Sequence, residues 1–151
     1  MSSDWPDPLA APEAARIQTA LEQFWPLLAD LAELLAAQEL LLGVERVAAL
    51  RSLVLELMLA LNGIQRPAGA RTLNRYLSRR QREALEKTLI TPRPDHDAYV
   101  GQAVALVVIY RWYAPQLVDK FGLAYPAETE QEVWQRISRL LPDWPAAITT
   151  D

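Results

Sequence analysis

The stretch HDAYVGQAVALVVIYRWYAPQLVDKF, residues 96–121, decides the fold class. Its middle, Ala103 to Tyr110, is apolar at every position, which suits either a buried strand or a buried helix. Length favours the helix, because no proline or glycine interrupts the chain between Gly101 and Pro115. A helix that is apolar on all sides belongs at the centre of a bundle. We therefore predict an all-α fold in which this helix is the central apolar element.

Apolar side chains at spacings of three and four predict further helices on both sides of this stretch. The first helix should bend at Pro26 and end in a break within 38–43, and Asn62-Gly63 should end the second. The predicted helices are 12–35, 44–61, 70–77, 79–89, 96–121 and 130–141. Six helices joined by short loops predict an antiparallel bundle.

Three helix starts carry capping residues. Asp95 precedes the central helix, and its carboxylate can accept a hydrogen bond from the first turn. Ser78 with Gln81 and Thr129 with Glu132 fit the capping-box pattern. These two pairs place the starts of the helices at residues 79 and 130.

The chain fits one globular domain. It has 151 residues, of which 51% are apolar and 23% are charged. We expect a flexible lead-in over 1–11, one helical-bundle domain over 12–141 and a tail over 142–151. The sequence contains no cysteine and no secretory leader, which together predict a cytoplasmic location. The longest apolar stretch, 27–43, is interrupted by three carboxylates, so no membrane span is predicted.

Basic residues concentrate between Arg66 and Arg93. This segment holds seven arginines and Lys87 against Glu83 and Glu86, a net charge of +6, whereas the whole chain carries −4 and the remainder therefore −10. The segment could pack beside the acidic part of its own fold, contact a partner, or bind nucleic acid. Because the acidic remainder repels a long polyanion, we predict no specific DNA or RNA binding.

Most charged side chains within the predicted helix 79–89 can form ion pairs with each other. At spacings of four, Arg79 can pair with Glu83 and Arg82 with Glu86. The less well compensated arginines are Arg66, Arg71, Arg75 and Arg80. We expect these side chains to meet a carboxylate-rich surface, on the same chain or on a partner.

Two carboxylates interrupt the first apolar helix and form a candidate binding site. Asp30 and Glu33 are three positions apart and therefore share one face of the helix. They could bind a small cationic ligand or act as a general base, or they could simply mark the edge of the helix that faces solvent. Trp25, about two turns before Glu33, could add a wall on which a ligand stacks.

Glu56 is a second candidate, because it interrupts the apolar run LVLELML at 53–59. A buried carboxylate requires a partner, and the candidates are Arg51, Arg46 and Arg111. We expect Glu56 to be buried and paired with one of them. A solvent-facing position and a role in ligand binding are the alternatives.

Arg111 is the last candidate for a ligand contact. It precedes Trp112 and Tyr113, and the three side chains could stack a base or a sugar, but core packing of the aromatic residues is the preferred interpretation. The single histidine, His96, is expected at the surface of a helix start, where it completes neither a metal site nor a nucleophile pair. The sequence predicts no catalytic residue, no metal and no cofactor.

Short motifs distributed over 24–141 point to a family. They are Phe24-Trp25, Ala-Gln-Glu-Leu-Leu at 37–41, Leu50-Arg51, Leu61-Asn62-Gly63, Arg75-Tyr76-Leu77 and Gly-Leu-Ala-Tyr-Pro at 122–126. They resemble the C-terminal helical domain of aminoglycoside adenylyltransferase-like nucleotidyltransferases. In that family an Arg-Gly step joins the first two helices, whereas this chain has Ala37-Gln38.

The catalytic half of the resembled family is missing from this sequence. That half is an α/β domain whose Gly-Ser and Asp-x-Asp motifs hold the magnesium of the nucleotide. Asp95-His96-Asp97 has the Asp-x-Asp letters, but it follows Thr-Pro-Arg-Pro and opens a helix. The resemblance therefore implies a substrate-side helical domain without its catalytic partner.

Three functional hypotheses follow. The leading one is a non-catalytic helical binding or interaction module. Its ligand would be a partner protein or a small cationic ligand, and the module could also form a homo-oligomer. The first alternative is the substrate-binding half of a split nucleotidyltransferase, with the catalytic domain on another chain. The second is a nucleic-acid-binding helical protein that uses Arg66–Arg93.

Overall fold

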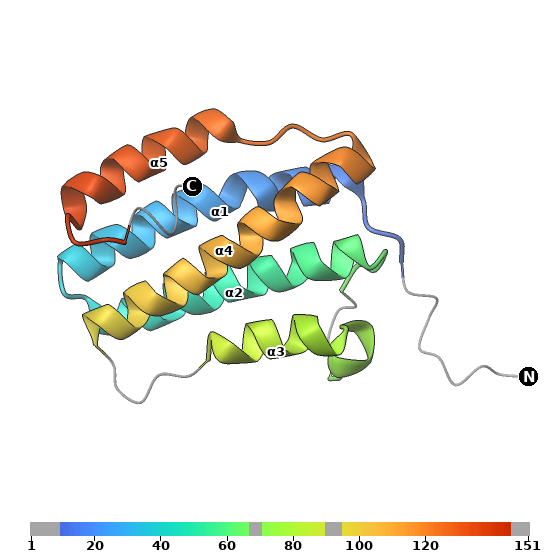
Figure 1. Ribbon diagram of the computed structural model, residues 1–151, viewed down its shortest axis with the longest axis horizontal. Coiled ribbons are helices and arrows are strands. Elements are labelled where there is room, and N and C mark those ends of the chain that lie inside the picture. Colours follow the sequence, from blue (N-terminus) through green and yellow to red (C-terminus); the bar gives the residue numbers. More distant parts are fainter. Residues whose placement is uncertain (1–9, 67–70, 90–94, 146–151) are drawn as a thin grey trace, which may run out of the picture.

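The computed structural model describes residues 10–66, 71–89 and 95–145 and consists of packed helices (Figure 1). The helices are α1 (Ala14–Ala36), α2 (Leu40–Leu61), α3 (Arg79–Lys87), α4 (His96–Phe121) and α5 (Ala127–Leu140). The described part of the chain contains no strand. Each helix in Figure 1 runs opposite to the one before it. The prediction of an all-α antiparallel bundle is confirmed.

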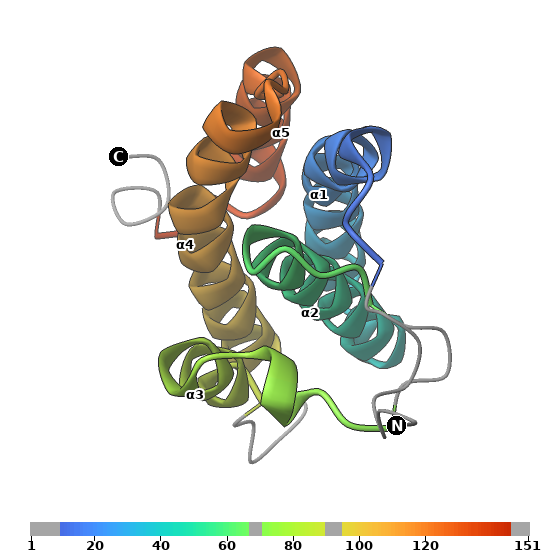
Figure 2. The same ribbon diagram turned by 90° about the vertical axis from the view of Figure 1, so that its right-hand side faces the viewer.

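The five helices form two layers. Figure 2 shows α1 and α2 on one side and α3, α4 and α5 on the other. Within the second layer α4 lies between α3 and α5, and it packs along α2 and also contacts α1 (Figure 1). None of the described helices combines the length with the apolar character that a membrane span needs.

Aromatic side chains join the two layers at the centre. Phe24 stacks on Tyr110 with ring centroids 4.1 Å apart, and Trp25 meets the same ring edge-on at 5.2 Å. The Trp25 indole N–H donates to the Tyr110 hydroxyl (3.2 Å), which donates in turn to the carbonyl of Leu21 (2.9 Å). Buried polar groups are thus satisfied, and α1 is fixed to α4.

The helix ends follow the predicted caps at two positions and differ at a third. Ser78 and Gln81 form the capping box, and the Asp95 carboxylate accepts from the N–H of Ala98 at 2.8 Å. The box predicted at Thr129 and Glu132 is wrong, because α5 begins three residues earlier, at Ala127. Pro126 precedes that start with the locked φ that suits it, and Glu128 and Glu130 favour the positive end of the first turn.

Three boundaries also differ from the prediction. The short helix expected over 70–77 is a single 3₁₀ turn at Asn74–Tyr76, while residue 70 lies outside the described residues. The break after the first helix is confirmed but shorter than expected, since α2 already begins at Leu40. The third helix ends at Lys87 and not at 89.

The predicted terminal segments are described only in part. Residues 1–9 and 146–151 lie outside the described residues, and residues 10 and 11 are not helical. Trp144, within the segment predicted as a tail, is buried and lies 6.2 Å from the Trp134 ring. The core therefore extends past residue 141.

Candidate functional site

Asp30 and Glu33 share one face of α1, as their spacing predicts. Together with Arg136 of α5 and neighbouring α1 residues they line a shallow depression of about 530 Å³. Asp30 pairs with Arg46, and Glu33 pairs with Arg136. Both carboxylates are therefore already neutralised, and the depression offers no unpaired negative charge to a small cation.

Trp25 lies in the core and not beside these carboxylates, so the predicted stacking wall is wrong. Its side chain is completely buried, and the Trp134 ring centroid lies 5.6 Å from its own. Trp25 and Asp30 are five positions apart, about 140° around a helix. Hence the tryptophan faces the second layer while Asp30 faces the rim.

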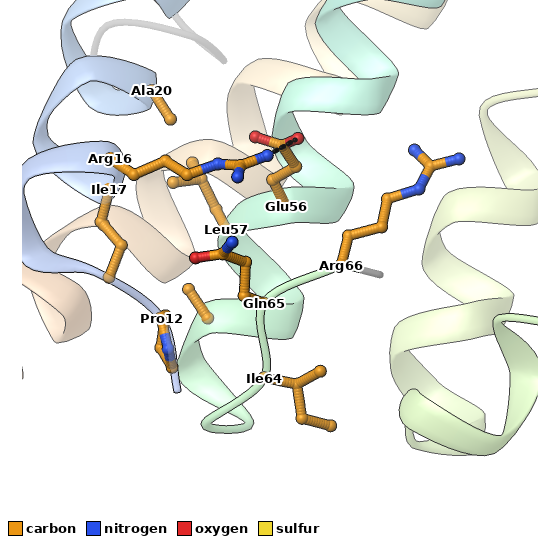
Figure 3. Close-up of a pocket in the computed structure, with 10 residues that line it drawn as sticks. Pro12, Arg16, Ile17, Ala20, Glu56, Leu57, Ile64, Gln65 and Arg66 are labelled. Atoms are coloured by element: carbon orange, nitrogen blue, oxygen red, sulfur yellow. Dashed lines mark ion pairs between the residues drawn. The ribbon is translucent and has the colours of Figure 1, made fainter. Parts of the chain in front are cut away.

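Glu56 is paired, but neither its burial nor its partner matches the prediction. Its side chain is 37% exposed, and its carboxylate lies 3.6 Å from the guanidinium of Arg16 in α1 (Figure 3). The predicted partners bind elsewhere, because Arg46 pairs with Asp30 and Arg111 with Glu130. The α2 surface at this position faces the first turn of α1 and solvent, and a carboxylate there needs little compensation.

The remaining predicted partner, Arg51 in the middle of α2, binds neutral acceptors. It donates to the hydroxyl (2.7 Å) and carbonyl (2.8 Å) of Thr88 and to the side-chain carbonyl of Gln102 (3.0 Å). Burial lowers the pKa of this guanidinium below its ordinary value. These bonds join α2, the end of α3 and α4 at one point.

A small pocket lies beside Glu56, between α1 and α2. Figure 3 shows the side chain of Gln65, from the loop after α2, reaching into it, while Arg66 points away from Glu56. The volume is about 30 Å³, room for one or two water-sized groups. A sugar or a nucleotide does not fit, so this pocket is not a substrate site.

Arg111 forms the best-buried ion pair among the described residues. Its Nη2 lies 2.7 Å from Oε1 of Glu130, and the two side chains are 24% and 13% exposed. The Trp134 indole N–H is 3.4 Å from the same oxygen. Burial, followed by a hydrogen bond with Glu130, raises the pKa of Tyr125. Arg111 therefore clamps α4 to α5, and the prediction that it stacks a base or sugar with Trp112 is not supported by this geometry.

No group of three His, Asp or Glu side chains that could hold a metal ion occurs among the residues that the structure describes. The three side chains of Asp95-His96-Asp97 do not converge on one point. Asp95 caps α4, and the His96 ring lies 3.3 Å from the carboxylate of Asp97.

The sequence interpretation missed an apolar surface on α4. One face of this helix, at spacings of four, three, four and three, carries Gly101, Ala105, Val108, Trp112 and Pro115, which we call the α4 face. Val108 is 48% exposed and Trp112 is 71% exposed. A helix that is apolar on all sides predicts burial on all sides, so the pattern alone could not show which face stays open.

A second exposed apolar cluster lies where α2 begins. Leu41 is 85% exposed, and Leu42 and Val44 are also exposed. Gly43 of the same turn lies against Tyr99, so the cluster sits beside the first turns of α4.

The basic segment has the internal pairs that its spacing predicts. Arg79 lies 2.8 Å from Glu83, and Arg82 lies 3.4 Å from Glu86. The arginines predicted to lack compensation within 71–87 are exposed, namely Arg71, Arg75 and Arg80, which we call the arginine surface. Arg93 lies outside the described residues.

The structure thus brings only Asp30 and Glu33 together out of the five predicted contact residues and places Trp25, Glu56 and Arg111 in separate surroundings. Comparison of the chain with family models, with curated proteins and with solved structures gives no match. What the chain does is therefore inferred from its own side chains.

Proposed function

We propose that this chain is a non-catalytic interaction module that binds a partner protein through the α4 face. The observation that carries the proposal is Trp112, a tryptophan that is 71% exposed in the interior of a long helix. Large apolar side chains in contact with water are costly, and contiguous ones mark interaction surfaces. Tryptophan is also among the residues that contribute most to protein–protein affinity.

The rest of the α4 face suits a docking helix or strand. Between Gly101 and Pro115 it carries no charged side chain, and its small residues allow a partner to approach the backbone closely. The opposite side of α4 is packed on α2 and α1, with Leu106 and Tyr110 fully buried. A rigid helix loses little conformational freedom on binding, which favours affinity.

A macromolecular partner fits these observations better than a small ligand. Small-molecule sites are concave and bury most of the ligand. The α4 face is the outward side of a helix. Of the two hollows beside Glu56, one holds only about 30 Å³ and the other, of about 320 Å³, is an open groove between α1 and α2 in which Glu56 is paired with Arg16. The carboxylates of the α1 depression are also paired with arginines. The motif resemblance favours one class of partner, a catalytic α/β chain of nucleotidyltransferase type.

Site-specific photo-crosslinking tests the proposal. A benzophenone amino acid replaces Val108, which is exposed on the α4 face, and in a matched variant it replaces Ser138, which is exposed on α5. The chain is expressed and irradiated in its native cells. We expect one discrete protein adduct from position 108 that disappears when Trp112→Ser is added, and no such adduct from position 138.

Equal adducts from both positions would mean that contacts are non-specific. An adduct from position 108 that survives Trp112→Ser would place the energetic contact outside the α4 face. Either result, or the absence of any adduct, contradicts the proposal.

A further inference from the structure

The arginine surface is held in a fixed geometry by the end of α2. The Asn62 side chain donates to the carbonyl of Tyr76 (2.9 Å) and to that of Gln81 (2.7 Å), and the Gln81 amide donates back at 3.1 Å. The same Gln81 oxygen accepts from the N–H of Ser78 in the capping box. The segment that carries the exposed arginines is therefore anchored at both the 3₁₀ turn and the start of α3.

Carboxylates of the described residues do not neutralise this surface. Residues 71–87 contain five arginines and one lysine against two glutamates, a net charge of +4. Both glutamates are used by Arg79 and Arg82. Among the described residues no carboxylate lies within ion-pair distance of the arginine surface, so its three cations face solvent. The expectation of a carboxylate-rich counterpart on the same chain is thus not met there.

We propose that the arginine surface binds an acidic segment of a partner protein. This inference rests on the proposed function and adds the chemistry of the partner. The partner would place apolar side chains on the α4 face and carboxylates on α3, which lies beside α4 in the same layer (Figure 2). Guanidinium groups bind carboxylates in planar, two-point contacts. Separate carboxylate side chains can also reach arginines that lie on different turns.

A nucleic acid fits the same surface less well. Glu83 and Glu86 lie among the basic side chains of α3 and are about half exposed. The rest of the chain carries −8, because the whole is −4 and residues 71–87 are +4. A long nucleic acid would be repelled both by Glu83 and Glu86 and by the acidic rest of the chain. A short acidic segment is repelled less by each of them.

The test measures binding of a fluorescent 20-residue polyglutamate and of a 20-nucleotide single-stranded DNA to the full chain at pH 7 and at about 50 and 150 mM salt. The variants are Arg80→Glu, the triple variant R71E/R75E/R80E and its neutral counterpart R71Q/R75Q/R80Q. Arg139→Glu is the matched control, since Arg139 is an exposed arginine of α5 that also has no carboxylate partner among the described residues. Circular dichroism verifies that each variant is folded.

We expect polyglutamate to bind with salt-dependent affinity, Arg80→Glu to weaken it about threefold, and the triple reversal to weaken it at least about tenfold, with the neutral triple variant in between. Arg139→Glu should change it less than about twofold. Trp112→Ser should leave it unchanged, because polyglutamate has no apolar side chain; this separates the inference from the proposed function.

No polyglutamate binding at the lower salt concentration, or an equal loss in Arg139→Glu and Arg80→Glu, would overturn the inference. Sub-micromolar DNA binding whose log–log salt slope is about −4 or steeper would also overturn it, in favour of a nucleic-acid interface.

Discussion

Gln38 holds a backbone conformation that glycine normally adopts. Its φ of 59° makes it the one residue other than glycine with positive φ in the described part of the chain. Its N–H donates to the carbonyl of Leu35, and that of Glu39 to the carbonyl of Leu34, which together form a Schellman end of α1. Gly63 ends α2 with the same hydrogen-bond pattern.

Gln38→Gly should therefore stabilise the protein. Removing the left-handed strain of a side chain gains about 1–2 kcal/mol, from which the greater freedom of glycine in the unfolded chain subtracts up to about 1 kcal/mol. We expect the free energy of unfolding to rise by about 0.5–1 kcal/mol in urea denaturation. Gln38→Ala keeps a β-carbon and should give no such gain. Equal effects of the two substitutions would contradict the claim that the side chain of Gln38 strains the backbone.

Among the described ion pairs, the carboxylate with the least exposed side chain is that of Glu130, at 13%, whereas the Glu56 side chain is 37% exposed. Glu130→Ala removes the acceptor of Arg111, Trp134 and Tyr125 at once, and should lower the free energy of unfolding by about 3 kcal/mol. Glu56→Ala removes only a loose, half-exposed pair and should cost less than about 1 kcal/mol. Urea denaturation of both variants at pH 7 measures the difference.

A larger loss of unfolding free energy in Glu56→Ala than in Glu130→Ala would mean that Glu56 carries the better-buried charge. The sequence could not assign the roles, because Glu56 stands in an apolar run whereas Glu130 stands in a polar one. What decides burial is the packing of α5 on α1, which brings Glu130 to Arg111 of α4. Local hydrophobicity does not report this long-range contact.

At the scale of elements, the positions of the helices could be predicted from the sequence, but the helix faces that stay exposed in the bundle could not. Length, capping residues and apolar spacing located α1 to α4, since these are local properties. The extra first turn of α5 was missed because Thr129 and Glu132 fit a capping box that the chain does not use. The open α4 face depends on how many neighbours cover a helix, which only the layered arrangement determines.

The junction of α1 with α4 should make stability depend on alkaline pH. Burial raises the pKa of Tyr110, with the Trp25 hydrogen bond opposing this and the charge of Glu130 adding to it. Because the folded pKa lies above the unfolded value of about 10, the unfolded state loses its proton first as the pH rises. The contribution of the protonated Tyr110 to the free energy of unfolding is therefore complete below pH ~10 and is lost as the pH rises above it.

We therefore expect the free energy of unfolding to fall above pH ~10 by up to about 1.4 kcal/mol per pH unit for each such tyrosine, Tyr125 being the second. Urea denaturation between pH 8 and 11 measures the slope. Tyr110→Phe should reduce this slope, although it also lowers stability at neutral pH by removing the bonds to Trp25 and Leu21. A slope that is the same in both proteins would rule out Tyr110 as its source.

At the scale of the whole molecule, the predicted fold class held while the predicted site did not. Composition and periodicity fix an α-bundle, but Asp30, Glu33 and Glu56 were selected as charges in apolar runs, and each of them proves to be paired with an arginine at the rim. Among the described residues, the surfaces that stay exposed without a partner include the apolar α4 face and the arginine surface, both in the second layer (Figure 2), and the apolar cluster at the start of α2. They favour a role in assembly.

An interaction module should transfer no nucleotide by itself. We expect no label to pass from radioactive ATP to an aminoglycoside when the purified chain is incubated with magnesium. The test is informative because the motif resemblance is to enzymes that perform this transfer. Transfer above a blank that contains no protein, retained through repeated purification, would contradict a non-catalytic chain.

The central claim, that a partner docks on the α4 face, is tested most directly by the affinity of the complex trapped from position 108. Calorimetry with the purified partner compares Trp112→Ala with Leu41→Ala, a control in the other exposed apolar cluster. We predict that Trp112→Ala raises Kd at least about 30-fold, the effect of losing a residue worth about 2 kcal/mol, while Leu41→Ala changes it less than about threefold. Equal changes, or a larger change for Leu41→Ala, would contradict the claim.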